Sequence, residues 1–565
     1  MKLTKLLALT LAVSCGSACG GTITFRNNTA VEDAELASVR VRLELQDEQL
    51  VPAATGTSYM LAQLDPQTLA PDAINAILRE VSSLYQERGV LATRAVVTKE
   101  SFLRSRAGGN LDIRIIEGRI SEVRVVPTEG GQALSQDKID RIAGAAPLGA
   151  GDLVEGPKLD ATVGQANRFS RQVVRPVLLP GDDGAVLEYR VKQLKEYQFR
   201  YAFDNFGTER TGETRHSIDY EQWNVFTIDD HLSLSGLIST EGDASMLRAD
   251  YMLPLDNIAS HRIKVALYGS NYSAQDVGLG ATGIEFEGES FGIIGTYERT
   301  LMNRNGAYLD GSVGVHFLSA MQDQSTLGVP SATTQYLLPF IGLRYSKSGV
   351  DTSWVLGAKL EGNLPGIAGT DSGVDLNLQG RLNASDEFLL GHIYGGYRTY
   401  LDEWFGGPNR RAHEFSVFGS ASASLAGDRV PPSFLSIVGG PYSVRGYPIG
   451  ILAGDNSIFV KTDYKIHLNR LTGGAQGARF LGDLPDLDLA LGAFMDVGSV
   501  SNEDRLTAFE VDDTIWSMGL GVSADYQDRY SLSLEYAWAL SELMTANEVI
   551  ESGDGQFYIK ATAKW

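Results

Sequence analysis

A glycine-rich stretch with one arginine contains the residue types that point most directly to a specific interaction. It reads GGPYSVRGY over residues 439–447, and its candidate residues are Gly439, Gly440, Val444, Arg445, Gly446 and Tyr447. An arginine inside a region otherwise patterned as β-strands needs a partner. A guanidinium–carboxylate pair in a partly desolvated site fixes the segment that carries it. We therefore expect Arg445 to hold a loop in place.

A matching carboxylate lies about fifty residues further along the chain. Residues 487–498 read LDLALGAFMDVG, which alternates between large apolar side chains and small or acidic ones. The candidate residues on the second face are Phe494, Asp496 and Gly498. A membrane barrel strand turns its apolar face to lipid and its other face to the lumen. Asp496 is thus predicted to face the lumen, where a folded-back loop brings Arg445 against it. Taken singly, Arg445 also fits the pattern of an ordinary arginine in a surface loop, and Asp496 fits that of an ordinary carboxylate facing the lumen.

Alternating strands of this kind continue from Tyr197 to the last residue. We count sixteen or seventeen of them, separated by connectors rich in Gly, Asn and Asp. A single-chain bacterial barrel closes with an even number of strands, so we expect sixteen antiparallel strands and assign residues 374–381 to a loop. The predicted transmembrane β-barrel spans residues 195–565, with a lumenal loop around 426–456. A large soluble β-sandwich or propeller is the alternative, but several successive strands have an apolar face capped by aromatics.

The last strand has the pattern that outer-membrane barrels commonly end on. Its apolar positions include Phe557, Ile559 and the terminal Trp565, and we interpret these three residues as a C-terminal barrel signal. Aromatic side chains at strand ends suit the two membrane interfaces.

The N-terminal third is α+β in pattern. Residues 1–19 read as a signal peptide, with Lys2 and Lys5 before an apolar run, and residues 20–38 as a linker. A β-helix-β-β pattern then occurs twice, over 39–117 and 118–194. Both cysteines, Cys15 and Cys19, lie beside the expected cleavage site, so no disulfide framework is expected.

Composition and motifs argue against several other classes. The net charge of −22 disfavours a nucleic-acid partner, and no run of eighteen apolar residues follows the N-terminus. The GxGxxG match at 278–283 lacks a strand-to-helix context, and the GxSxG match at 288–292 lies in strand-like sequence. The seven histidines show no metal spacing. We therefore expect no enzyme activity, cofactor or metal.

Together these features resemble one family. The motif at 444–447, the later Phe494-x-Asp496-x-Gly498, two α/β units and a terminal aromatic strand are similar to the two-partner secretion transporters (TpsB, the FhaC/ShlB-type hemolysin secretion/activation proteins). This family belongs to the POTRA-barrel outer-membrane superfamily. Residues 85–94 and 115–118 resemble its first POTRA domain, and residues 178–181 resemble its second.

The resemblance implies a location and a function. It implies an outer-membrane barrel of sixteen strands, with POTRA domains in the periplasm of a Gram-negative-type bacterium. These domains would capture an unfolded exoprotein, a large β-helical TpsA-like chain, which the barrel exports without ATP. Implied partners are outer-membrane lipids and the barrel-assembly machinery that inserts the protein itself, with no nucleic acid. Many relatives also carry an N-terminal plug helix and a linker, which 20–38 is too short to hold, so we expect no plug.

One alternative function stays open at this point. The arginine motif is shared with BamA-like factors that insert other barrels into the outer membrane. This chain has two α/β units rather than five, and that number favours the secretion transporters over the BamA-like factors.

Overall fold

The structure is a computed structural model. It describes residues 21–565 except 129–132, 182–183, 276–284, 325–328, 368–372, 472–485, 506–509 and 546–547. The predicted signal peptide and the GxGxxG match lie outside the described residues. Two compact units make up the chain: Met1–Val126 with Ala146–Asp160 and Arg175–Arg190, and Pro127–Ala145 with Ala161–Val174 and Val191–Trp565. Residues 118–194, predicted as one domain, are divided between them.

The first α/β region has two small sheets around one long helix. Its elements are β1 (Ile23–Arg26), α1 (Asp33–Ser38), β2 (Arg40–Gln46), β3 (Gln49–Pro52), β4 (Thr57–Met60), α2 (Pro71–Glu87), β5 (Arg94–Val97), α3 (Lys99–Arg106) and β6 (Leu111–Ile116). The strand orders are β1-β6-β5 and β3-β2-β4. Helix α2 begins at Pro71, which suits the first helical position, and Gly89 follows its end in the left-handed conformation.

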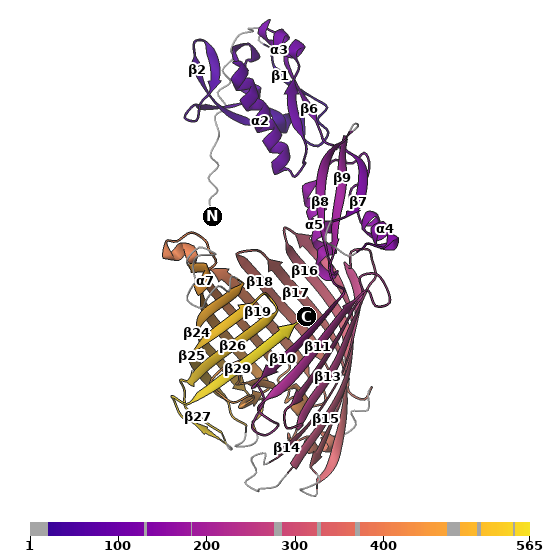
Figure 1. Ribbon diagram of the computed structural model, residues 1–565, viewed down its shortest axis with the longest axis vertical. Helices are drawn as coiled ribbons and strands as arrows, with labels where there is room; N and C mark the ends of the chain where they lie inside the picture. The colour runs from indigo at the N-terminus through magenta and orange to yellow at the C-terminus, as the bar shows by residue number, and fades with distance from the viewer. Residues whose placement is uncertain are drawn as a thin grey trace, which may run out of the picture. The chain divides into compact units, whose positions relative to one another are not determined.

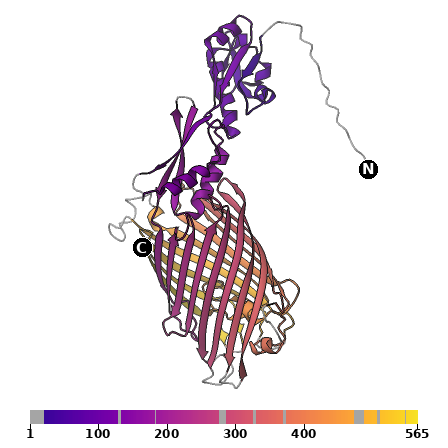
Figure 2. The ribbon, with the colours of Figure 1, turned by 90° about the vertical axis from the view of Figure 1, so that its right-hand side faces the viewer.

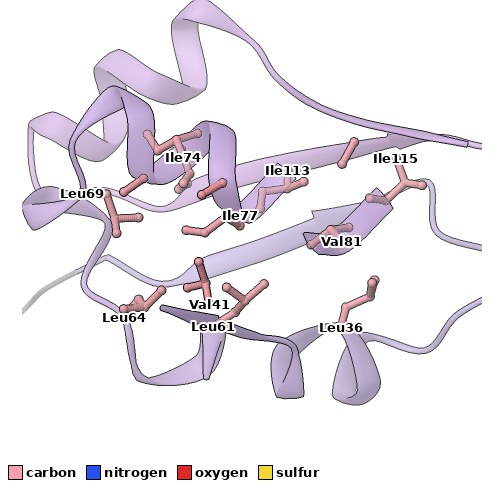
Figure 3. Close-up of a cluster of buried hydrophobic side chains, with 14 of the residues drawn as sticks. Leu36, Val41, Leu61, Leu64, Leu69, Ile74, Ile77, Val81, Ile113 and Ile115 are labelled. Atoms are coloured by element: carbon pink, nitrogen blue, oxygen red, sulfur yellow. The ribbon is translucent and has the colours of Figure 1, made fainter. Parts of the chain in front are cut away.

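The core of this region forms around the apolar face of α2 (Figure 3). Ile74, Ile77 and Val81 recur at helical spacing and are buried against Ile113 and Ile115 of β6. Burying each of these side chains contributes about 1.5–3 kcal/mol. The helix and the strand that the sequence predicts here thus stabilise each other.

The segment predicted as a linker, 20–38, contains two elements of this fold. Strand β1 pairs in parallel with β6, with Ile23 opposite Leu111, and Leu36 of α1 is fully buried. The turn between them is held by Glu117, whose carboxylate accepts hydrogen bonds from the backbone N–H groups of Thr29 at 2.6 Å and Ala30 at 2.8 Å. These elements are hard to predict from the sequence because the residues that pair with β1 and hold the turn lie almost ninety residues away.

The second α/β region repeats the sheet-and-helix theme. Its elements are β7 (Ile120–Pro127), α4 (Gln136–Gly144), α5 (Gly156–Phe169), β8 (Gln172–Gly181) and β9 (Gly184–Gln193), with the strand order β7-β9-β8. Ser135 caps α4 by accepting a hydrogen bond from the Lys138 N–H. No helix in the described part of the chain is long and apolar enough to cross a membrane.

Sixteen antiparallel strands close into a barrel, which confirms the predicted fold class (Figures 1 and 2). They are β10 (Tyr197–Asp204), β11 (Arg215–Trp223), β12 (His231–Ser239), β13 (Ala244–Pro254), β14 (His261–Gln275), β15 (Glu285–Arg304), β16 (Ala307–Gln324), β17 (Val329–Ser348), β18 (Thr352–Gly362), β19 (Leu389–Tyr400), β20 (His413–Ser424), β23 (Asn456–His467), β24 (Leu487–Ser501), β25 (Asp513–Tyr526), β26 (Tyr530–Ala539) and β29 (Gly555–Lys564). The seam between β10 and β29 pairs Arg200 with Lys564 and Asp204 with Lys560 at its two ends. Residues 374–381 lie outside the wall, partly in α6 (Gly373–Leu378).

Side chains alternate across the barrel wall as the strand pattern predicts. On β24, Leu491 and Met495 are 46% and 48% exposed, whereas Phe494 and Asp496 are buried. A strand whose outer face is apolar and accessible fits a lipid environment. The segment that matches GxSxG lies inside β15, without the strand-to-helix turn of a nucleophile elbow.

Three long connections lie at one rim of the barrel. Because strands alternate in direction and their number is even, β10 begins and β29 ends at the same rim. The connections after β18, β20 and β24 therefore all lie at the opposite rim. We call them loop 363–388, the lumenal loop (425–455) and loop 502–512.

Glu117→Gln tests the turn that holds β1 and α1. Burial of the Glu117 side chain raises the pKa of its carboxyl group. The hydrogen bonds from Thr29 and Ala30 outweigh this effect and hold the pKa below its ordinary value. The stability that the carboxylate confers is therefore complete above its ordinary pKa, about 4.3, and is lost as the pH falls through the folded-state value. We expect the Thr29 and Ala30 amides to exchange hydrogen about tenfold faster in the variant at pH 7. The difference should shrink below pH 4, and a constant difference across this range would contradict the assignment.

Candidate functional site

A two-stranded stalk carries the predicted arginine motif. Strands β21 (Ser436–Val438) and β22 (Leu452–Gly454) pair antiparallel within the lumenal loop. The segment 439–451 forms the tip between them. Val438 and Leu452 on the stalk are buried in one apolar cluster with Val444 and Tyr447 of the tip.

Two glycines allow the chain to turn at the start of the tip. Gly439 and Gly440 have φ values of 118° and 84°, in the region that favours glycine. A Cβ on Gly439 would lie 2.4 Å from the Pro448 carbonyl oxygen. Ser443 closes the turn, since its hydroxyl accepts from the Gly439 N–H at 2.8 Å and donates to the Gly439 carbonyl at 3.0 Å. The glycines that the sequence singled out are therefore required by the backbone.

Arg445 reaches the barrel wall and binds Asp496 of β24 with two nitrogens on one edge of its guanidinium. Its Nε and Nη2 donate to the two carboxylate oxygens at 2.7 and 2.8 Å, and its backbone N–H donates to Oδ2 at 3.1 Å. Nη1 lies 2.8 Å from Asp463 Oδ1 on β23 and 3.3 Å from Glu535 Oε2 on β26. One cation thus joins the loop to three strands of the wall.

The arginine is desolvated as well as paired. Arg445 is 3% exposed and Asp496 is 0% exposed, and the guanidinium carbon lies 3.5 Å from the centre of the Phe494 ring. Charges buried to this extent interact strongly, and removing one partner costs about 3–5 kcal/mol. Stacking on the aromatic face adds to the attraction.

The rest of the motif fits the tip into the wall. Tyr447 is fully buried, and its hydroxyl oxygen lies 2.9 and 2.8 Å from the backbone oxygens of Trp516 and Ser541. The Gly446 N–H donates to the Tyr558 hydroxyl at 3.0 Å. A Cβ on Gly498 would lie 2.7 Å from Cγ2 of Val444. Gly498 therefore leaves the space that the valine occupies.

The C-terminal residues lie elsewhere on the barrel. Phe557 and Trp565 are 50% and 53% exposed. The Trp565 ring packs 5.4 Å from Phe199 on β10, and the backbones of these two residues exchange hydrogen bonds. Ile559 is opposite Leu534 on β26. These residues line the last strand near the seam, separate from the Arg445 contacts, and their role as an assembly signal stays a prediction.

Sequence reasoning missed three residues of the site: Asp463, Glu535 and Tyr558. Each lies on the lumenal side of a strand, and period-2 alternation alone places Glu535 opposite the apolar face of β26. The missing step was register, because only the closed barrel brings β23, β26 and β29 to the same loop tip. In the described part of the chain, no group of His, Cys, Asp and Glu residues could hold a metal ion. The predicted absence of a cofactor stays a prediction.

Known proteins with related sequences are transporters. No family model matches the chain. It is 24% identical over 190 residues to the outer membrane transporter CdiB of Dickeya dadantii, and 25% identical over 195 residues to the hemolysin transporter protein ShlB of Serratia marcescens. These segments cover 32% and 34% of this chain and 32% of each relative. The chain thus spans about a third of the length of the curated relatives it matches.

Solved structures share the fold over nearly the whole chain. CdiB from Escherichia coli aligns with a TM-score of 0.67 at 16% identity, covering 99% of this chain and 93% of that one. CdiB from Acinetobacter baumannii aligns with a TM-score of 0.61 at 14% identity, covering 97% and 95%. BamA from Haemophilus ducreyi, lacking POTRA domains 1–3, aligns with a TM-score of 0.50 at 13% identity, covering 89% and 95%.

Fold and site together define the class of protein. A closed barrel of sixteen strands, preceded by α/β regions and containing a loop fixed to the wall by an arginine, shares its fold with the two CdiB structures. The sequence matches to CdiB and ShlB, over 32% and 34% of the chain, point to similarity with the two-partner secretion transporters, TpsB. The barrel fold and the outer membrane transporter among its relatives indicate the outer membrane as its location.

Substitutions in the Arg445 cluster should speed hydrogen exchange at the loop tip to different extents, which depend on which charges each one leaves unpaired. Arg445→Ala leaves the buried Asp496 carboxylate unpaired beside two further carboxylates, and we expect the Gly446 amide to exchange at least a hundredfold faster. Asp496→Asn leaves Arg445 with Asp463 and Glu535 and should cost less. Arg445→Lys should not restore the wild-type rate, because an ammonium lacks the planar fork. Equal exchange of the Gly446 amide in the wild type and the three variants would show that the Arg445 cluster does not hold the loop tip.

Gly498→Ala should push the loop tip away from the wall by contact with Val444. Overpacking of this kind costs about 1–3 kcal/mol. Adding Val444→Ala should recover part of the loss, since it removes one of the two methyl groups that the new Cβ meets; the other is Cγ1 of Val438, 2.6 Å away. The matched control is Gly492→Ala on the same strand, where the nearest atom to a Cβ is 3.6 Å away. Trypsin cleavage at Arg445 in the folded protein reports the displacement, and equal cleavage of the two alanine variants would refute this packing.

Proposed function

We propose that this protein captures an unfolded exoprotein in the periplasm and exports it through its barrel without ATP, as in type Vb two-partner secretion. The observation that carries the proposal is the loop held in the lumen by the buried Arg445–Asp496 pair. A loop fixed by ionic contacts can be released when those contacts break, which is the kind of change that a gated pore requires. The names of both curated relatives describe transporters.

Capture of an extended chain suits the small sheets of the α/β regions. Strands β5, β7 and β8 each have a strand partner on one side only in the described sheets. An exposed edge accepts an extended peptide through main-chain hydrogen bonds, largely independent of sequence. We propose POTRA domains at 39–117 and 118–194, the first extended at its N-terminus to include β1 and α1.

Passage of the chain requires the lumenal loop to move. The cavity beside Arg445 is about 190 Å³ and is lined by Lys461, Glu535 and Tyr558 among others, which is room for roughly six water molecules. An extended polypeptide needs more space than this. Folding of the exported chain outside the cell would bias its movement outward, so no nucleotide is needed.

The proposed partners follow from this function. The exported protein is a large β-helical chain of the TpsA type, outer-membrane lipids contact the apolar outer face, and the barrel-assembly machinery inserts the protein. We propose no enzyme activity. The alternative is a BamA-like factor that inserts other barrels, supported by the BamA fold match, whose TM-score of 0.50 is lower than the 0.67 of CdiB.

Secretion by cells that carry this gene and its genomic neighbour tests the proposal. With the wild-type protein we expect one large protein in the medium, and with Arg445→Ala an amount about tenfold lower, although the barrel still forms. Cells with the neighbour alone are the control. If no protein is exported, and many outer-membrane barrels decline when this gene is depleted, the assembly-factor alternative replaces the exporter.

A further inference from the structure

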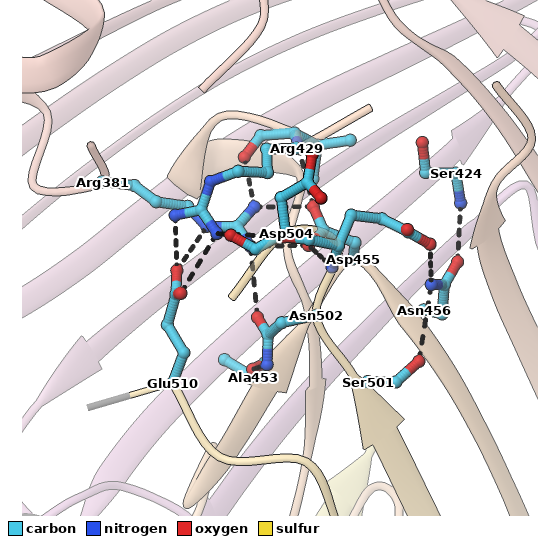
Figure 4. A network of polar contacts seen from close by, with 12 residues as sticks. Arg381, Ser424, Arg429, Ala453, Asp455, Asn456, Ser501, Asn502, Asp504 and Glu510 are labelled. Carbon is cyan, nitrogen blue, oxygen red and sulfur yellow. Dashed lines mark hydrogen bonds and ion pairs between the residues drawn. The ribbon is translucent and has the colours of Figure 1, made fainter. Parts of the chain in front are cut away.

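A second buried ion cluster lies at the rim where the three long loops meet (Figure 4). It consists of Arg381 from loop 363–388, Arg429 and Asp455 from the two ends of the lumenal loop, and Glu510 from loop 502–512. We call these four residues the rim latch. Arg381 and Arg429 are 5% exposed and Asp455 is 1% exposed. The cluster is separate from the Arg445 site.

Asp455 connects all three loops. Its two carboxylate oxygens accept from Nη1 and Nη2 of Arg381 at 2.6 and 2.5 Å. They also accept from the backbone N–H groups of Val430 at 2.7 Å and Glu503 at 2.8 Å. With four donors around it, this buried carboxylate is fully satisfied only while the loops stay together.

Glu510 adds a second connection between the same loops. Oε1 lies 3.1 Å from Nε of Arg381 and 2.6 Å from Nη2 of Arg429, and Oε2 lies 3.0 Å from Nη1 of Arg429. Arg429 also donates to the carbonyl oxygens of Leu382, Glu503 and Asp504. Two arginines and two carboxylates balance in charge, so the cluster is stable when closed and leaves unpaired charges when pulled apart.

Apolar contacts hold loop 363–388 against the inside of the wall near the rim latch. Leu376 and Phe388 of this loop are buried with Tyr336 of β17 and Val430 of the lumenal loop. The Gln379 side chain donates to the carbonyl oxygens of Ala320 and Ala332 on β16 and β17. The contacts bring this loop, the lumenal loop and the wall together at the rim opposite the chain ends of the barrel.

The rim latch holds the base of the same loop whose tip Arg445 holds. Arg429 and Asp455 flank the stalk formed by β21 and β22, so the stalk cannot shift as a unit while both ends are bound. We propose that the rim latch closes the surface exit of the pore and has to open during export. The closure and its opening rest on the proposed function, whereas the joining of the three loops follows from the contacts alone.

Hydrogen exchange measures the closure without any exported protein. Glu510→Gln keeps the side chain's shape but removes the charge that both arginines share. In the full-length protein we expect the Val430 and Glu503 amides, which bond to Asp455, to exchange about tenfold faster. Glu209→Gln, the same change at an exposed residue of another loop at this rim, should leave them unchanged. If Glu510→Gln has no effect on a folded barrel, the closure is wrong.

Reversible cross-linking tests the role in export. The double variant Arg381→Cys/Glu510→Cys is joined by a thiol cross-linker long enough to replace the two side chains, and each single-cysteine variant receives the same reagent. We expect export to fall to background only in the cross-linked double variant and to return on reduction. Export at the wild-type rate by the cross-linked protein would overturn the proposal. If the wild type exports nothing, the proposed function fails, and the exchange result then decides only whether the rim latch holds the three loops together.

Discussion

The buried guanidinium of Arg445 is the interaction on which the arrangement of the lumen depends. It faces Asp496, Asp463 and Glu535 from three strands and stacks on Phe494. These carboxylates repel one another in a confined space, and cations among them offset the repulsion. Lys461 of β23 lines the same cavity, but Arg445 is the cation that pairs with both oxygens of Asp496. The turn at Gly439 and Gly440 and the buried side chain of Tyr447 fix the shape of the tip, so Arg445 binds the wall in one orientation.

The period-2 pattern explains which parts of this site could be read from the sequence. Alternation along β24 assigns Asp496 to the lumen without knowledge of any other strand, and the glycine-rich context marks Arg445 as a loop residue. Asp463 and Glu535 could not be connected to Arg445, because that needs the register and curvature of the whole barrel. The same limit applies to β1, where Ile23 and Phe25 look like linker residues until β6 lies beside them.

The barrel itself was predictable for a related reason. A strand that is apolar on one face and small or polar on the other has one stable environment, with lipid outside and packed loops or water inside. Parity of the strand count resolved the remaining choice and placed residues 374–381 in a loop. The short helix α6, by contrast, is stabilised by contacts of Leu376 with distant residues, which local sequence does not reveal.

Two ionic clusters fasten one loop at its tip and at its base. If the protein exports a chain as proposed, the pore opens by breaking these charged contacts, whereas the wall and the stalk keep the backbone hydrogen bonds that a membrane protein requires.

The most direct measurement of this account joins the loop tip covalently to the wall. The Val444→Cys/Gly498→Cys pair places one thiol on each side of this contact, where a Cβ at position 498 would lie 2.7 Å from Val444 Cγ2. Because a side chain at 498 also overpacks the contact without any bond, Gly498→Cys alone is the control. Export of the exoprotein is then compared before and after reduction in the same cells. We expect no export of the exoprotein while the disulfide is closed, and recovery of export when the disulfide is reduced. Unchanged export by the oxidised protein would show that the loop does not have to leave the wall.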